Sequence, residues 1–438
     1  MPLRLAASDS DFETRFTALV EARRETDTDI ARDVAAIIAD VRARGDDAVA
    51  EYTEKFDGFS LNETTWSVDR EERTSALDRL DKDLRDALEL AAGRIRTFHE
   101  KQRPQDSQTI DAAGVRMGSR WSAVETAGLY VPGGRAAYPS SLLMNAIPAL
   151  VAGVEHIVMV TPTPGGEINP LILAAAEIAG VGEIYRIGGA QAVAALAFGT
   201  DTVPSADVIV GPGNAWVAEA KRQLYGTVGI DMVAGPSEIV VIADRDNDPD
   251  WIAADLLSQA EHDPTSQSIL FTDCVEFADA VDRAVETQLA MLTTEETAQT
   301  SWANNGAIIC VDTLDDALPL SDRLAPEHLE LAVADPDALF LRVRHAGSVF
   351  LGRLTPEAIG DYVGGPNHVL PTGRRARFSS GLSVLDFMKR TSFLRCDEQS
   401  LEAIGPAAVR LAEAEGLPAH ARSVAMRLPR REPENRSD

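Results

Sequence analysis

Short runs of β-branched residues, most of which end in glycine or proline, alternate along this chain with alanine-rich stretches. Five such runs follow one another between residues 127 and 246: AGLYVPGG, HIVMVTPTPGG, EIYRIGGAQ, DVIVGPGN and EIVVIADRD. Helical stretches such as NPLILAAAEIAG and AWVAEAKRQLYG lie between them. Strand, glycine-rich turn and helix in repetition are typical of a parallel α/β sheet. We therefore expect an α/β fold that binds ligands at the carboxyl ends of its strands, where the glycines fall.

The flanking regions differ from this α/β core. Three further candidate strands, SQSILFTD, GAIICVD and AGSVFLG, extend the core toward residue 352. The first part of the chain, to about Pro104, is charged, and its apolar residues recur at helical spacing in DIARDVAAIIADVRARG and DALELAAGRIRTFHEKQRP. From Gly381 onward the pattern returns to helix. The sequence thus predicts helical segments at both ends of an α/β core.

The charge balance limits the partners. Asp and Glu number 69 against 41 Lys and Arg, which gives a net charge of -28. A field this negative repels phosphate, so we expect no nucleic acid as a main partner. Only five of the basic residues are lysines. This composition fits a halophilic protein in a high-salt cytoplasm, and it equally fits an acidic protein from a GC-rich genome.

No segment of the sequence has the character of a membrane or export signal. The first residues, MPLRLAASDSDFETRF, contain no apolar core, and the most apolar stretch, 140–160, is interrupted by polar residues and a proline. We expect no signal peptide and no membrane span, and a cytoplasmic location. The three cysteines are widely separated, which disfavours a disulfide framework and a cysteine-rich metal site.

Two motifs contain residues suited to metal binding. Gln259 and His262 of DLLSQAEHDP are three positions apart, so a helix would place both on one face, where zinc accepts oxygen and nitrogen ligands. The alternative is a histidine that merely lies near a helix C-terminal dipole. Asp361 and His368 of GDYVGGPNH fall in a predicted irregular loop. Such a loop can present ligands, or it can be a plain multiple turn capped by the aspartate.

Two other motifs pair a glutamate with a histidine. Glu327 and His328 of LAPEHLEL are adjacent, and partial burial would let both titrate near neutrality, as general acid–base chemistry requires. They would share a cleft more easily in a turn than in a helix that begins at Pro326, where Glu327 would only complement the helix dipole. Glu415 and His420 of AEAEGLPAHARSV lie on either side of a turn, and by themselves they indicate a surface helix–turn–helix.

The glycine-rich and serine motifs constrain the chemistry further. GPGNAW has the first two glycines of a dinucleotide fingerprint, but Trp216 occupies the place of the third. Gly211, Gly213 and a helix that begins near Asn214 still offer backbone N–H groups to an anion or a ribose. Ser237 of AGPSEI has no GxSxG elbow around it, which argues against a serine hydrolase.

Taken together, these motifs resemble one family. LYVPGG, GGAQA, VGPGNAWVAEAKRQLYG, DMVAGPSE, LLSQAEH, APEHLEL, GDYVGGPNHVLPT and FSSGLSVLDFMKR are similar, in this order, to histidinol dehydrogenases. The resemblance implies an enzyme that oxidises L-histidinol through the aldehyde to L-histidine, the last steps of histidine biosynthesis. It implies a zinc ion (Zn2+) and two NAD molecules that are reduced in sequence at one site.

The resemblance also implies an architecture of two incomplete Rossmann-like domains with parallel sheets and small, mainly helical terminal domains. The implied ranges are 1–25 for an N-terminal helical segment, 26–129 with 237–381 for the first Rossmann-like domain, 130–236 for the second, and 382–438 for a C-terminal helical domain exchanged in a homodimer.

The roles of individual residues follow from the same resemblance. The implied zinc ligands are Gln259, His262, Asp361 and His420. The implied catalytic acid–base pair is Glu327 and His328. Substrate contacts would come from the catalytic pair, the zinc ligands and three further residues, Ser237, His368 and Glu415. NAD contacts would come from Tyr130, Gln191 and Asn214. His420 would be supplied by the partner subunit, so the homodimer would share its sites.

Two other classes of protein remain as alternatives. A zinc hydrolase that cleaves an amide or amidine uses similar ligands and a glutamate base, but it does not need the glycine-ended strands of a nucleotide site. A non-catalytic binding protein with the same fold would be expected to lack some of the catalytic pair or of the ligands, and all of them are present.

Overall fold

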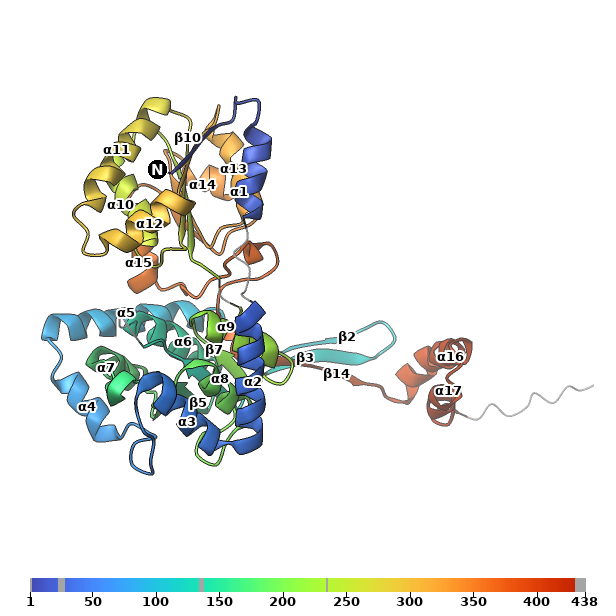
Figure 1. The fold of residues 1–438 in the computed structure, drawn as a ribbon. Coiled ribbons are helices and arrows are strands. Elements are labelled where there is room, and N and C mark those ends of the chain that lie inside the picture. The colour runs from blue at the N-terminus through green and yellow to red at the C-terminus, as the bar shows by residue number, and fades with distance from the viewer. Residues whose placement is uncertain (1, 23–27, 134–137, 234, 430–438) are drawn as a thin grey trace, which may run out of the picture. The chain divides into compact units, whose positions relative to one another are not determined.

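The computed structural model describes residues 2–22, 28–133, 138–233 and 235–429. The chain folds into two compact units, Met1–Gln102 with Val124–Phe387, and Arg103–Ala123 with Met388–Asp438. The first unit contains two parallel sheets with helices on both faces (Figure 1). The expected α/β fold with two parallel sheets is therefore confirmed.

The larger sheet has six parallel strands in the order β1-β11-β10-β9-β12-β13. Their bounds are Leu3–Ala6 (β1), Ala307–Cys310 (β11), Gln267–Thr272 (β10), Glu238–Ala243 (β9), His328–Ala332 (β12) and Ser348–Leu351 (β13). Alternate residues of β9 enter different cores: Ile239 packs on one face of the sheet and Val240 on the other. This explains why the strand is apolar along its whole length.

Helices cover both faces of this sheet (Figure 1). One core includes α10 (Pro249–Ala260), α11 (Val275–Leu289) and α12 (Glu295–Asn305). The other includes α1 (Phe12–Glu21), α13 (Leu314–Leu324) and α14 (Pro336–Phe340). The short helix α15 (Glu357–Tyr362) follows β13 and contacts α10.

The smaller sheet has five parallel strands in the order β6-β5-β4-β7-β8. Their bounds are Glu183–Tyr185 (β6), His156–Val160 (β5), Thr126–Tyr130 (β4), Val208–Val210 (β7) and Gly229–Ile230 (β8). The helices that alternate with these strands are α6 (Pro139–Ala152), α7 (Pro170–Ala179), α8 (Gly189–Phe198) and α9 (Ala215–Leu224). The five runs predicted as strands, AGLYVPGG to EIVVIADRD, correspond to β4, β5, β6, β7 and β9, so these predictions are confirmed.

The N-terminal helices pack on this smaller sheet domain. They are α2 (Thr28–Arg44), α3 (Asp46–Asp57), α4 (Arg70–Asp78) and α5 (Lys82–Glu100). α2 contacts α8 and α9, α4 contacts α7, and α5 contacts α6. The expected domain ranges instead grouped residues 26–129, which contain these four helices, with residues 237–381 in the first Rossmann-like domain. Helical periodicity identifies the apolar face of such a helix, but it does not identify the partner of that face.

The second unit combines an antiparallel sheet with two helices. The sheet order is β14-β3-β2, with bounds Met388–Arg395, Arg116–Ala123 and Ser107–Ile110. Helices α16 (Glu398–Ala414) and α17 (Pro418–Ala425) follow β14. Short 3-10 turns at Pro164–Gly166, Arg375–Arg377 and Val384–Phe387 complete the described elements of the molecule.

Both terminal segments contain strands where the sequence predicted only helices. Leu3–Ala6 pairs with β11 at the edge of the larger sheet, within the range expected to be an N-terminal helical segment. Met388–Arg395 pairs with β3 throughout, so the expectation that helix resumes at Gly381 is wrong for this stretch. Neither strand has a long alternating pattern, and each depends on a partner more than 250 positions away, which local periodicity does not reveal.

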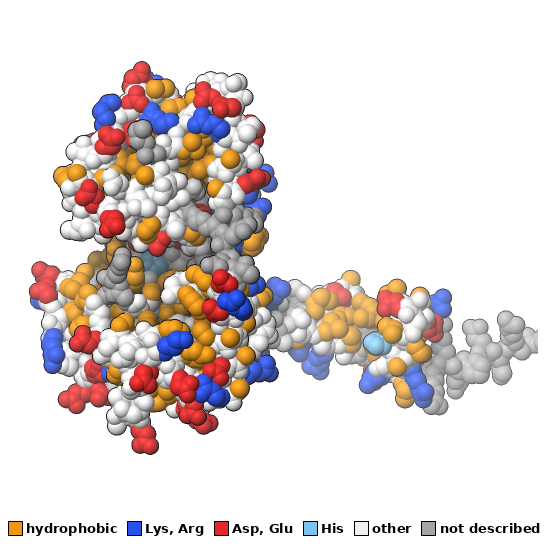
Figure 2. Space-filling model, in the orientation of Figure 1, with side chains coloured by type: hydrophobic (Ala, Val, Ile, Leu, Met, Phe, Trp, Pro, Cys, Tyr) orange, Lys and Arg blue, Asp and Glu red, His pale blue; other side chains and the backbone are white. Residues whose placement is uncertain are grey.

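The surface of the molecule reflects the acidic composition. Carboxylate side chains are scattered over the face drawn in Figure 2 and are interspersed with Lys and Arg. In the part of the chain that the structure describes, no helix combines the length and the apolar character needed to cross a membrane. The three cysteines, all described, are free.

Candidate active site

The candidate catalytic pair lies where strands of the larger sheet begin. His328 is the first residue of β12, and Glu238 is the first residue of the neighbouring strand β9. α10 runs back from the end of β9, so Gln259 in its last turn comes to the same edge. The candidate residues of this sheet thus gather at the amino ends of its strands, whereas the sequence led us to expect ligands at carboxyl ends.

The local structure around the pair also differs from the predicted helix or turn. α13 ends at Leu324, and Ala325 adopts the left-handed conformation that reverses the chain. Glu327 and His328 then enter the sheet as a strand begins. The alternative in which Glu327 complements a helix dipole is thus excluded.

The imidazole of His328 is buried, and only its Nδ1 atom has hydrogen-bond partners among the described residues. Its Nδ1 lies 3.0 Å from Oε1 of Gln259 and 3.2 Å from the carbonyl oxygen of Glu238. Two oxygen acceptors at Nδ1 favour the tautomer that has its proton there. Nε2 is buried and has no hydrogen-bond partner among the described residues. Burial lowers the pKa of His328 to about 4, so near neutral pH the ring is uncharged and Nε2 is free to accept a proton.

Glu327 is buried beside this ring. Its Oε2 accepts a hydrogen bond of 3.0 Å from the backbone N–H of Glu238 and lies 3.9 Å from Nδ1 of His328. Burial raises the pKa of Glu327 well above its usual value, and nearby carboxylates act in the same direction. A carboxylate at this position would be a stronger base than an exposed one once its proton has been removed.

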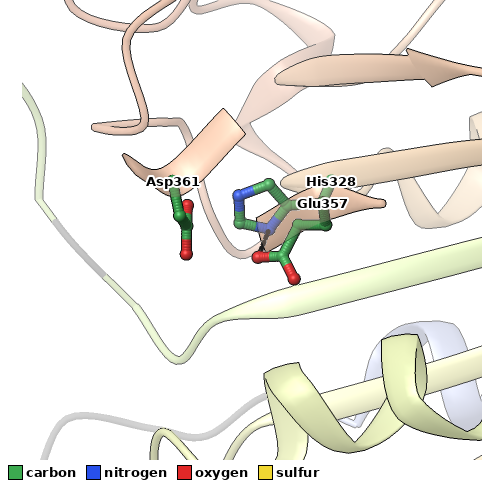
Figure 3. A group of neighbouring side chains, drawn as sticks. All are labelled: His328, Glu357 and Asp361. Carbon is green, nitrogen blue, oxygen red and sulfur yellow. Dashed lines mark ion pairs between the residues drawn. The ribbon is translucent and has the colours of Figure 1, made fainter. Parts of the chain in front are cut away.

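A second acid, Glu357, lies beside His328. Oε1 of Glu357 lies 3.6 Å from Nδ1 of His328, and Oε2 of Glu357 accepts a hydrogen bond of 3.0 Å from Ser258. Burial raises the pKa of Glu357 to about 7. His328, Glu357 and Asp361 each offer an atom within 4.8 Å of the others, which is close enough for a metal ion to bind among them (Figure 3).

Glu357 is absent from the predicted site residues, although the sequence contains a signal for it. Pro356 and Glu357 have the character of a helix start, and Asp361 follows four positions later on the same helical face. The prediction that Asp361 lies in an irregular loop is wrong, because Asp361 belongs to α15. Burial raises the pKa of Asp361 to about 6.

Gln259 and His262 are neighbours, as their spacing predicted. Nε2 of Gln259 lies 3.2 Å from Nδ1 of His262. His262 follows the end of α10 and is more exposed than Gln259, which is fully buried. Crowding of protein atoms around the ring lowers the pKa of His262, and the nearby Asp361 carboxylate opposes that change. The structure thus brings Gln259, His262 and Asp361 to one place.

His368 joins this cluster from the loop after α15. Its Nδ1 lies 2.9 Å from the backbone carbonyl oxygen of Asp361, and its Nε2 lies 3.2 Å from Oγ of Ser141 in α6. Burial lowers the pKa of His368 to about 4. Ser237 directly precedes β9 and is therefore at the same strand edge as His328.

Glu415 and His420 belong to the second unit. Glu415 ends α16, His420 lies in α17, and both are exposed. The predicted helix–turn–helix is confirmed here, with Gly416 in the turn at a φ of 73°. The described contacts do not include either residue in the cluster around His328.

The three residues expected to contact NAD lie at the carboxyl ends of the smaller sheet. Tyr130 ends β4, Gln191 lies in the first turn of α8, and Asn214 caps α9 after β7. The Tyr130 hydroxyl accepts a hydrogen bond of 3.1 Å from the N–H of Gly189. Oε1 of Gln191 is buried without a partner among the described residues, which leaves an acceptor for a ligand.

Comparisons with known proteins agree on one family. The family model described as histidinol dehydrogenase matches residues 20–428. The chain is 66% identical over 428 residues to a histidinol dehydrogenase of Zymomonas mobilis, with 98% of this chain and 100% of that protein covered. It is 63% identical over 431 residues to one from Rhodospirillum rubrum, with coverages of 98% and 99%. A crystal structure of histidinol dehydrogenase from Elizabethkingia anophelis superposes with a TM-score of 0.92 at 36% identity, and covers 97% of this chain and 98% of that one.

Proposed function

The chain belongs to the histidinol dehydrogenase family and is thus an oxidoreductase, and from this premise we propose that it oxidises L-histidinol to L-histidine through the aldehyde. Two NAD+ would be reduced in sequence, and zinc would be required. One observation supports this proposal most directly. An uncharged, buried His328 with a free Nε2 lies beside the buried acid Glu327, which is the arrangement that stepwise removal of protons from an alcohol and from water requires.

The donor set fits a zinc ion. Gln259, His262 and Asp361 bring oxygen and nitrogen atoms to one place, and we assign them as ligands. The buried Oε1 of Glu357 has no hydrogen-bond partner among the described residues, and Glu357 offers an oxygen within 4.8 Å of a ligand atom of Asp361, so a cation held there would have a further acceptor nearby. Bound zinc would orient an imidazole-bearing substrate and polarise its alcohol oxygen.

In the first oxidation, His328 is the proton acceptor. Its Nε2 takes the alcohol proton while hydride leaves the substrate carbon for NAD+, which gives the aldehyde, NADH and a protonated imidazole. Burial of the ring, which lowers the pKa of His328, favours loss of that proton before the next step.

In the second oxidation, Glu327 acts on water. Its carboxylate takes a proton from the water that attacks the aldehyde carbon and returns a proton to the former carbonyl oxygen, which gives the hydrate and regenerates the carboxylate. His328 then accepts a hydroxyl proton from the hydrate while the second hydride leaves for NAD+, which gives the carboxylic acid. Retention of the aldehyde in a buried site avoids its release into solution.

The remaining assignments concern binding. Ser237, His368 and Glu415 would contact the substrate, and Tyr130, Gln191 and Asn214 would contact NAD. The net negative charge opposes binding of the NAD phosphates, so backbone N–H groups of the glycine-rich loops would supply the local donors. The N–H of Gly211 is not among them, because it already donates to the Asp231 carboxylate. His420 would come from a second copy of the chain, as the fourth zinc ligand of a shared site in a homodimer. We also propose that the enzyme works in a cytoplasm of high salt concentration.

Spectrophotometry of NADH formation tests the function. Purified protein, L-histidinol and NAD+ should yield two NADH per histidinol consumed, and the assay is repeated across salt concentrations. A chelator should abolish the activity, and added zinc should restore it. If zinc-loaded protein forms no NADH from histidinol at any salt concentration, the proposed dehydrogenase function is refuted. Release of ammonia from an amide or amidine would then favour the zinc hydrolase function.

A further inference from the structure

A buried ion pair lies beneath the loop GPGN of the smaller sheet domain. Lys221 of α9 pairs with Asp231, which follows β8, and their side chains are only 3% and 1% exposed. Lys221 is one of five lysines in the chain. No step of the proposed reaction uses either residue.

Both polar groups of Gly211 are bound by this pair. The N–H of Gly211 donates to Oδ2 of Asp231 at 2.8 Å, and its carbonyl oxygen accepts from Nζ of Lys221 at 2.9 Å. The other oxygen of Asp231 accepts from the N–H of Met232 at 2.6 Å. The ion pair is thus directed at the start of the loop.

Gly211 in turn lies against Tyr130. Its φ is 113°, and a Cβ at this position would lie 2.1 Å from the carbonyl oxygen of Tyr130. Three residues later, Asn214 accepts from the N–H groups of Trp216 and Val217 and thereby starts α9, the helix that contains Lys221. A displacement of Gly211 would therefore be transmitted to Tyr130 and Asn214.

Stability alone gives a weak reason for such a pair. Desolvation of two charges offsets most of their attraction, and an apolar pair of similar volume is often equally stabilising. The specific effect of the pair is directional, because Asp231 accepts from the peptide unit before Gly211 and Lys221 donates to the peptide unit after it.

We propose that Lys221 and Asp231 are positioning residues that hold the GPGN loop in the conformation that binds NAD. This inference rests on the proposed function, since it assigns the loop to the same cofactor. Neither side chain touches NAD, and both act through Gly211.

Three variants test the pair: Lys221→Met, the nearly isosteric Asp231→Asn, and the double variant Lys221→Met/Asp231→Leu, which removes both charges and keeps apolar volume. The Kd for NAD+ is measured by calorimetry, and KM for NAD+ and for histidinol by initial rates. We expect the Kd and KM for NAD+ to rise about 10- to 100-fold, as for the loss of a charge-assisted hydrogen bond. KM for histidinol and the zinc content should stay unchanged.

Arg73→Met is the matched control. Arg73 is buried in the same sheet domain, pairs with Glu177 at 3.3 Å and donates to the carbonyl oxygen of Gly182, away from the GPGN loop. This variant should melt at a lower temperature and bind NAD+ as the parent does. A charge-free double variant that folds and binds NAD+ as tightly as the parent would overturn the positioning role.

The outcomes separate the two proposals. A parent that binds NAD+ but does not oxidise histidinol refutes the proposed function, while the variants still report on the loop. A parent that oxidises histidinol, with variants whose Kd for NAD+ is unchanged, refutes the positioning role alone.

Discussion

Oε1 of Gln259 lies 3.0 Å from Nδ1 of His328, so a proposed zinc ligand and the proposed base are in direct contact. With the carbonyl oxygen of Glu238, this contact keeps the proton of the ring on Nδ1 and leaves Nε2 free. Because burial lowers the pKa of His328 to about 4, the base form persists across the physiological pH range. The tautomer and the charge of the base are thus fixed by its surroundings.

Replacement of His328 tests its role as base. His328→Asn should lower the turnover number by about 100- to 10,000-fold, because general-base catalysis contributes that much. Zinc content, measured by atomic absorption, should not change. His345→Asn, in the same unit but outside the cluster, is the control and should keep full turnover. Loss of zinc from His328→Asn would assign His328 as a ligand instead.

Replacement of Glu327 should affect the two oxidations unequally. Glu327→Gln removes the proposed base for water, so oxidation of the aldehyde should slow by about 100-fold or more, while oxidation of the alcohol should slow less. Single-turnover rates with histidinol and with the aldehyde as separate substrates measure the difference. Equal losses in both rates would contradict a role confined to hydration.

A site shared between subunits predicts complementation. His420→Asn and Glu327→Gln homodimers should each be nearly inactive. Heterodimers formed after dissociation and reassociation should regain up to about half of the parental sites, since one of the two shared sites then contains neither substitution. The heterodimers are tagged, purified by two affinity steps and assayed for NADH formation from histidinol. Verified heterodimers that remain inactive would argue against the exchange.

The buried acid Glu330 predicts a pH dependence of stability. Burial raises the pKa of Glu330 well above its usual value, and its hydrogen bond with Asp255 acts in the same direction. The folded state therefore holds this proton more tightly than the unfolded chain does. The stabilisation is fully present below the unfolded pKa and is lost as pH rises through the folded pKa.

Urea unfolding between pH 5 and pH 8 measures this effect. The free energy of unfolding of the parent should fall with rising pH. The free energy of unfolding of the Glu330→Gln variant should fall less steeply, because the amide of the new glutamine does not titrate. Glu295→Gln, which changes an exposed glutamate of α12, serves as the control and should follow the parent. Parallel curves for the parent and Glu330→Gln would contradict the prediction.

Features that depend on neighbours along the chain were predictable from the amino-acid sequence. The runs of β-branched residues became β4 to β7 and β9, because β-branched residues and turn residues act locally. Ordered motifs such as SQAEH and PEHL identified the family and named residues that the fold gathers, including Gln259 and His262.

The contacts between segments far apart along the chain became known from the three-dimensional fold. It placed His328 at the beginning of a strand, and it added Glu357 to the site because α15 packs near the end of α10. It also paired β14 with β3 and joined Lys221 to Asp231 beneath Gly211. These relationships depend on contacts between residues far apart in sequence and on the exclusion of water around them, and neither is encoded in a local pattern of residues.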